Sequence, residues 1–213
     1  MTINRKEALR YMGIRGEVTD EALNGMIDEC ISEVSDAAEP RHVLRCFELE
    51  ITGDNIVRAG GISMPSANLS RNLRGCESVY FMAATLGNGI DRILSRYTRL
   101  WISKAAVFQA VAAAAIEGYC NDCQNELSAK LAGSGLYLRP RFSPGYGDLP
   151  LSVQQDFLGV LNASRTVGIV LSPGGVMIPE KSVTAVMGVG RDNTRCHIEG
   201  CESCSRTDCA YRR

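Results

Sequence analysis

The sequence lacks a long hydrophobic segment. Its longest apolar stretch spans residues 105–116, is interrupted by Gln109 and has only 12 residues, whereas a membrane span needs roughly 18. The first seven residues are polar and contain no apolar core like that of a secretory leader. We therefore expect neither a membrane segment nor a leader, and a cytoplasmic location.

The sequence also lacks an excess of charge of either sign. Lys and Arg total 23, Asp and Glu total 24, and the formal net charge is −1. Broad electrostatic binding to nucleic acid needs a basic surface, and adhesion to anionic lipid needs clusters of Lys and Arg. The composition therefore predicts neither nucleic acid nor a membrane as a partner.

No internal repeat or low-complexity region is present, and the order of predicted elements is mixed. Residues 78–86 are rich in strand formers, and a long helix is predicted from about 103 to 131, with a middle that is apolar on every face. Strands at 168–172 and 183–189 are separated by a Pro-Gly-Gly connection typical of a hairpin or meander. We predict an α+β fold, not a Rossmann fold, with an antiparallel sheet or meander, a long buried helix and surrounding helices.

The first candidate site is the loop at residues 139–150, which contains three prolines and two glycines. Arg141 offers a planar fork of donors that suits a carboxylate. Gly145 allows close backbone approach, and Tyr146 supplies a flat ring with a hydroxyl group. The alternative is a surface connector whose arginine pairs with a neighbouring acid.

The second candidate is Glu117, which follows directly on the apolar stretch. A carboxylate at the edge of a buried helix is costly unless it meets a cation or a donor. It could bind the amino group of a ligand. It could equally lie where the helix reaches solvent, or pair with an arginine.

The C-terminal tail holds four of the nine cysteines within 18 residues. We predict one domain over residues 1–192, with 1–74 as its N-terminal part, and a Cys-rich appendage over 193–213. The four thiols could hold a structural zinc ion or an iron–sulfur cluster, or they could form disulfides or stay reduced. These cysteines are Cys196, Cys201, Cys204 and Cys209.

Three other features suggest structure more than chemistry. Cys120 and Cys123 fall in the middle of the predicted long helix, where a thioredoxin-like motif does not function, so we expect buried structural thiols. His42 at a strand start indicates no specific role. The Gly188-Val189-Gly190 run lacks the third glycine and the following helix of a dinucleotide fingerprint.

The run from Arg141 to Tyr146 resembles the Arg-x-x-x-Gly-Tyr signature of the activation domain of cobalamin-dependent methionine synthase. The helix carrying Glu117 precedes it, as in that family. Residues 172–175 resemble the family's Trp-Pro-Gly-Ala segment, and residues 179–192 resemble its closing strand. The resemblance lies in the ordered set, because the signature itself is short.

This resemblance implies a domain that binds S-adenosylmethionine (AdoMet) outside any Rossmann fold and presents its methyl group to cobalamin in the cob(II) state. Arg141 would hold the ligand's carboxylate and Glu117 its ammonium group. The backbones of Ser143 and Gly145 would line the site, and Tyr146 would lie between ligand and corrin. No catalytic residue is expected, because the nucleophile is the reduced cobalamin.

The sequence departs from the family in ways that define its partners. It has no clear counterpart of the family's N-terminal acidic contact, and Met177 and Ile178 stand near the place of a family tyrosine. It lacks the folate, homocysteine and cobalamin modules. The resemblance therefore implies a free-standing component of methyl transfer that meets a separate corrinoid protein and an electron donor such as flavodoxin or ferredoxin. The alternative is a four-cysteine metal-binding adaptor, or an iron–sulfur redox module, without AdoMet chemistry.

Overall fold

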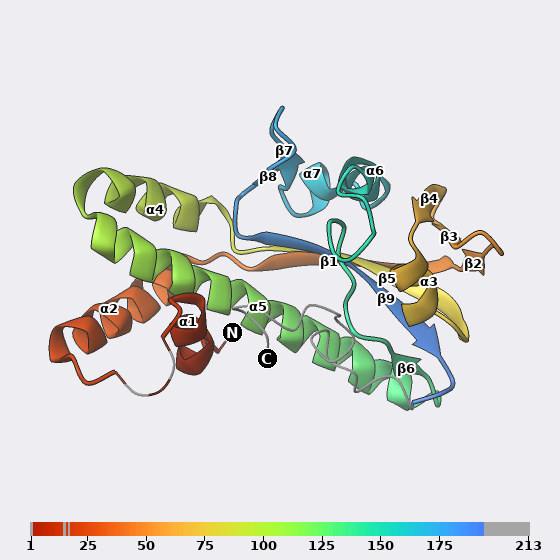
Figure 1. Cartoon of the computed structure of the whole chain (residues 1–213), viewed down its shortest axis with the longest axis horizontal. Coiled ribbons are helices and arrows are strands. Elements are labelled where there is room, and N and C mark those ends of the chain that lie inside the picture. Colours follow the sequence, from red (N-terminus) through yellow and green to blue (C-terminus); the bar gives the residue numbers. More distant parts are fainter. Residues whose placement is uncertain (1, 15, 17, 194–213) are drawn as a thin grey trace.

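A four-stranded antiparallel sheet divides the molecule into two helical layers (Figure 1). The computed structural model describes residues 2–14, 16 and 18–193. One layer contains the long helix, and the other contains short helices and two small sheets. The predicted α+β class with antiparallel strands is confirmed.

The main sheet has the strand order β1-β5-β9-β6. Its strands are β1 (Arg41–Glu48), β5 (Cys76–Thr85), β9 (Ser182–Gly190) and the short β6 (Tyr137–Leu138). Strands β5 and β9 lie in the middle and are mostly buried, because helices cover both faces of the sheet. Their apolar side chains feed two separate cores, one on each face.

The layer on one face is built around α5, a helix of 31 residues. Its apolar middle packs among three other helices and the sheet, as predicted. Asn4 and Asp20 cap two of the neighbouring helices by accepting hydrogen bonds from first-turn backbone amides. The helices of this layer are α1 (Arg5–Tyr11), α2 (Glu21–Ala37), α4 (Asn88–Leu100) and α5 (Ile102–Ala132).

The opposite layer consists of short elements around a second core. Phe81 of β5 stacks on Phe157, with ring centroids 4.3 Å apart. The helices are α3 (Ala67–Asn72), α6 (Val153–Val160) and α7 (Ala163–Thr166), and the small strands are β2 (Glu50–Ile51), β3 (Ile56–Ala59), β4 (Ile62–Pro65), β7 (Val170–Leu171) and β8 (Met177–Ile178).

The strand pairing near the C-terminal part differs from the sequence expectation. The turn at residues 172–175 does close a hairpin, but it joins β7 to β8 and not to the strand at 183–189. That strand belongs to β9, which pairs with β5 along its whole length. The physical reason is burial: β9 is apolar on both faces and so belongs in the middle of a covered sheet.

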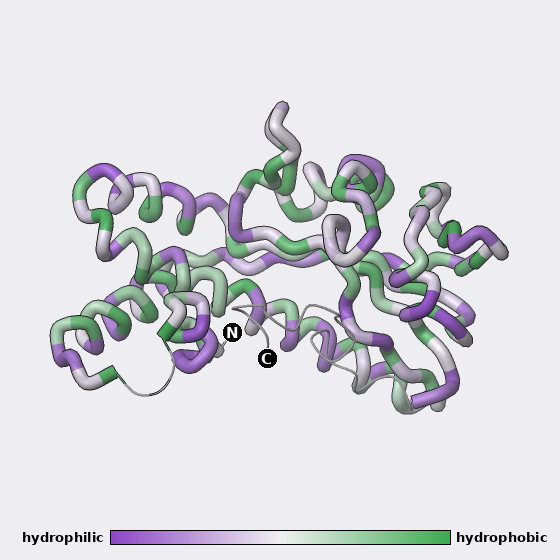
Figure 2. The backbone as a smooth tube through the Cα atoms, viewed as in Figure 1, coloured by the Kyte–Doolittle hydropathy of each residue, from purple (hydrophilic) through white to green (hydrophobic). Residues whose placement is uncertain are grey.

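Polar and apolar residues alternate along α1, α2 and α4 (Figure 2), as expected for helices that bury one face. Within the described residues, no helix combines the length and the hydropathy of a membrane span.

Candidate functional site

The segment after β6 is fixed along β9 on both sides of Arg141. The Arg139 amide donates to the Gly188 carbonyl at 2.8 Å, and Phe142 exchanges backbone hydrogen bonds with Val186 at 2.9 and 2.8 Å. Phe142 is buried in the core that contains α6. Because neighbouring side chains of an extended chain point to opposite sides, Arg141 places its guanidinium on the other side, against α5.

Arg141 makes three side-chain hydrogen bonds to α5. Its Nη2 donates to Glu117 Oε2 at 3.1 Å and to Asn121 Oδ1 at 2.8 Å, and its Nη1 donates to Gln124 Oε1 at 3.0 Å. The three acceptors are spaced four and three residues apart, so they share one helix face. Only 16% of the Arg141 side chain is exposed.

The structure thus brings together the two predicted headgroup residues from positions 24 apart in sequence. The ion pair that the sequence left as an alternative, between Arg141 and an acid, is formed, and its acid is Glu117. Asn121 and Gln124 were missed, although their i+4 and i+7 spacing from Glu117 was a signal for a shared face.

The other predicted residues lie in a tight turn. Gly145 has a φ of +84°, which favours glycine, and its amide donates to the Leu149 carbonyl at 2.9 Å. The Tyr146 amide donates to the Ser143 carbonyl at 3.0 Å. Tyr146 is 42% exposed, and its ring packs edge-on against Phe142, with centroids 5.2 Å apart. Ser143, Gly145 and Tyr146 therefore occupy one rigid turn.

Asp148 fastens this turn to the opposite layer. Its carboxylate accepts hydrogen bonds from the Ser66 hydroxyl and from the Ala67 and Asn68 amides at the start of α3. Burial alone would raise the pKa of Asp148, but these donors hold it below its usual value. The loop is thus fixed at its end as well as at Arg141.

The N-terminal part of the chain lies next to Glu117. A Cβ on the adjacent Gly118 would be 2.7 Å from the Thr2 carbonyl, so only glycine allows this close approach. The pKa of Tyr11 is raised, chiefly by burial and further by the Glu117 carboxylate. Sequence reasoning gave the N-terminal segment no role near the site, and no motif there could have revealed one.

A second group of polar side chains joins β1 to α5. His42 Nδ1 is 2.8 Å from the Tyr119 hydroxyl and 3.4 Å from Cys123 Sγ. Both thiols of the helix are buried, as predicted. Burial raises the pKa of Cys120 to about 12 and raises that of Cys123 as well. These thiols are therefore poor nucleophiles.

Gly188 has a packing role in β9. A Cβ there would be 2.6 Å from Cys76 Sγ and 2.7 Å from Leu73 Cδ2. The glycine is therefore required by side chains packed over the strand, in line with the sequence argument against a dinucleotide fingerprint.

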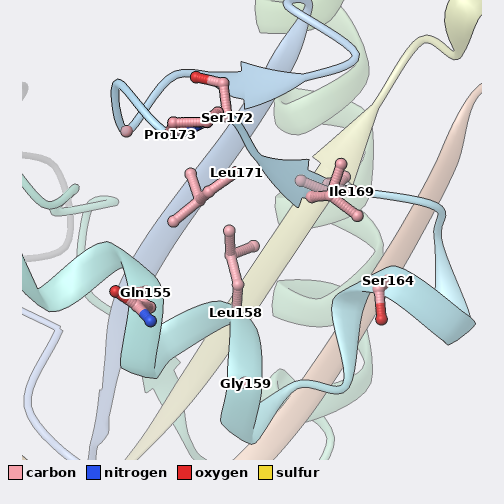
Figure 3. Close-up of a pocket in the computed structure, with 10 residues that line it drawn as sticks. Gln155, Leu158, Gly159, Ser164, Ile169, Leu171, Ser172 and Pro173 are labelled. Atoms are coloured by element: carbon pink, nitrogen blue, oxygen red, sulfur yellow. The ribbon is translucent and has the colours of Figure 1, made fainter.

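An open pocket of about 610 Å³ lies in the opposite layer (Figure 3). Its lining comes from α6, α7, β7 and the turn at 172–175, and it includes Gln155, Leu158 and Ser164. None of the predicted headgroup or loop residues lines it. The turn that resembles the Trp-Pro-Gly-Ala segment contributes Ser172, Pro173 and Gly175.

Metal binding was predicted only for the tail. Among residues 2–14, 16 and 18–193, no group of three or more His, Cys, Asp or Glu side chains could hold a metal ion. The four tail cysteines, Cys196, Cys201, Cys204 and Cys209, lie outside the described residues. The zinc or iron–sulfur site and the division at residue 192 stay predictions.

Comparison with known proteins bears on the fold. No protein-family model matches the sequence, and no curated protein is similar to it. Among solved structures, the chain is similar to one described as the MetH reactivation domain bound to AdoHcy, with a TM-score of 0.61 and 13% sequence identity. The similarity covers 89% of this chain and 73% of that chain. The chain therefore has the fold of the MetH reactivation domain.

Proposed function

We propose that this chain binds AdoMet and acts as a reactivation subunit for a cobalamin-dependent methionine synthase or a related corrinoid methyltransferase. The observation that carries the proposal is the pair of Arg141 and Glu117, 3.1 Å apart. This pair lies in a chain that shares its fold with a domain solved with AdoHcy. AdoMet and AdoHcy differ by one methyl group and carry the same amino-acid headgroup.

Arg141 and Glu117 suit the two charged ends of that headgroup. The guanidinium can grip a carboxylate with two parallel N–H groups, and the Glu117 carboxylate can accept from an ammonium group. A zwitterion that inserts between them replaces one opposite-charge contact by two, so charge stays balanced. The limited exposure of Arg141 strengthens each contact relative to bulk water.

In this proposal, the turn that follows Arg141 in sequence orients the rest of the ligand. The backbones of Ser143 and Gly145 line the site, and the exposed ring of Tyr146 faces the corrin. AdoMet supplies the methyl group, the partner protein carries the cobalamin, and a donor such as flavodoxin or ferredoxin supplies the electron. The chain itself contributes orientation, so it is a methyltransferase component without a catalytic acid or base.

Calorimetric titration with AdoMet and AdoHcy tests the proposal. We expect binding of the wild type in the range of about 1–100 μM and at least ~50-fold weaker binding of Arg141→Ala, because the carboxylate loses its charged partner. Arg165→Ala, a change of another arginine on the opposite layer, serves as the control and should bind normally. Absence of AdoMet binding by the wild type would reject the proposal.

The methyl-transfer step needs a separate assay. A corrinoid protein in the cob(II) state, reduced flavodoxin and AdoMet are mixed with and without this chain, and formation of methylcobalamin is followed by its visible spectrum. We expect methylation only when the chain is present, and a loss of rate in Arg141→Ala at AdoMet concentrations that saturate the wild type. Equal rates with and without the chain would contradict a reactivation role.

A further inference from the structure

Asn121 and Gln124 occupy hydrogen-bond donors of Arg141 that a ligand carboxylate would need. Nη2 donates to both Glu117 and Asn121, and Nη1 donates to Gln124. A guanidinium grips a carboxylate either end-on, through Nη1 and Nη2, or side-on, through Nε and Nη2. Because Nη2 belongs to both edges and both of its N–H groups are in use, either mode must release Glu117 or Asn121.

The three acceptors differ in what they gain when they are released. Glu117 is charged, and under the proposed function it takes the ligand's ammonium group. Asn121 and Gln124 present neutral amide oxygens to Arg141. The ligand's ammonium group already has Glu117 as its partner and does not need both amides. Their contacts therefore compete with the ligand carboxylate for the donors of Arg141, and this competition lowers the ligand's apparent affinity.

We propose that Asn121 and Gln124 form a competing clasp that holds Arg141 on α5 and restricts binding to ligands with a carboxylate. A carboxylate displaces the amide oxygens because it carries a full negative charge and can accept two parallel hydrogen bonds from the guanidinium, whereas each amide oxygen is neutral. A neutral ligand group cannot. This inference rests on the proposed function, because it concerns the same guanidinium, but it assigns a role to two residues that the headgroup contacts do not require.

The clasp makes a prediction opposite in sign to that for Glu117. Removal of Glu117 takes away the partner of the ammonium group and should weaken AdoMet binding. Removal of the two amides frees Arg141 and should tighten it. Asn121 is exposed and Gln124 half-buried on the surface of α5, and alanine is the better helix former at such positions, so the double variant should keep its fold.

The experiment is a calorimetric titration of Asn121→Ala/Gln124→Ala with two ligands. We expect AdoMet to bind roughly 3- to 10-fold more tightly than to the wild type, as two partly exposed hydrogen bonds no longer compete. 5′-Methylthioadenosine keeps the adenosine and the sulfur but has no carboxylate, so its affinity should not change. Asn125→Ala, a change of an exposed asparagine on the same helix, is the matched control and should bind AdoMet as the wild type does.

Two outcomes would overturn the clasp while leaving the proposed function intact. Weaker AdoMet binding by the double variant would mean that the amides position Arg141 for the ligand. Equal tightening for AdoMet and 5′-methylthioadenosine would mean a general loosening of the site. If the wild type binds no AdoMet, the proposed function itself fails, and the clasp fails with it.

Discussion

Two cations lie at the long helix α5 in contrasting surroundings. Lys104, near the start of α5, is 7% exposed, and its Nζ lies 3.0 Å from Glu29 and 2.9 Å from Glu33 of α2. The same Nζ also lies 5.0 Å from the centre of the Tyr97 ring. Arg141, in the segment after β6, faces one carboxylate and two neutral amides that lie farther along α5.

Under the proposed function, this difference separates a structural cation from one that binds a ligand. The Glu33 hydrogen bond is the main reason why the pKa of Lys104 lies above its ordinary value, and two carboxylates leave that amine nothing to gain from a third. Arg141 is compensated by a single carboxylate, and its amide partners can be exchanged for a stronger acceptor. The contrast predicts that substitution of Lys104 changes mainly the stability of the fold, whereas substitution of Arg141 changes mainly the ligand affinity.

The largest expected effect is on stability, from Lys104→Met. Removing the cation takes from Glu29 and Glu33 the buried amine that they share, and leaves Glu33 with only its Tyr97 hydrogen bonds, which should lower the free energy of unfolding by about 2 kcal/mol. Thermal unfolding would then occur at a temperature lower by roughly 4–8 °C, with AdoMet affinity unchanged. Lys130→Met, which breaks an exposed pair with Glu126 on the same helix, should change stability by less than about 0.5 kcal/mol. Similar unfolding temperatures for the two variants would show that Lys104 stabilises the fold no more than an exposed lysine does.

The next effect is on binding, from Arg141→Lys. The substitution keeps the charge but loses the planar fork, so it cannot form two parallel hydrogen bonds to a carboxylate. We expect AdoMet to bind about 30-fold more weakly, with a change in unfolding free energy below about 1 kcal/mol. The two quantities are measured by calorimetry and thermal unfolding. A loss of stability as large as that of Lys104→Met would show that Arg141 is structural too.

The smallest effect concerns Glu33, one of the two carboxylates that pair with Lys104. Burial would raise the pKa of Glu33, but hydrogen bonds from Tyr97 and Lys104 bring it below its ordinary value of 4.5. A depressed pKa stabilises the fold above pH 4.5, and that contribution is lost as the pH falls through the folded-state pKa. Glu33→Gln lacks this contribution, so its stability should approach that of the wild type as pH falls below 4.5, over a range of about 1 kcal/mol or less. Curves of unfolding free energy against pH that stay parallel for Glu33→Gln and the wild type below pH 4.5 would contradict this account.

Much of the fold could be predicted from local sequence. The strand predicted at residues 78–86 and the helix predicted at about 103–131 match β5 and α5 within a few residues, because both are long and strongly patterned. The sequence did not reveal the hairpin of β3 and β4. Its strands have only four residues each, too few to establish a period.

The candidate site was predicted in part. Arg141 and Glu117 were found from residue type and from a family resemblance, and the structure places them in contact. Asn121 and Gln124 were not found, because a polar residue on an exposed helix face is ordinary until another segment is known to pack there. Likewise, the sequence did not reveal the partners of His42, because Tyr119 and Cys123 are distant in sequence and lie beside it only in the folded chain.

The sequence by itself determined the length of the buried helix, the rigid turn with its glycine at 145, and the presence of an arginine and a glutamate suited to an amino-acid headgroup. Only the tertiary structure decided that β9 lies between β5 and β6, and that its register places the Arg141 side chain on α5 beside Glu117. The reason is that periodicity and turn residues act over a few neighbours, whereas strand order and register depend on which apolar faces are buried together across the whole chain.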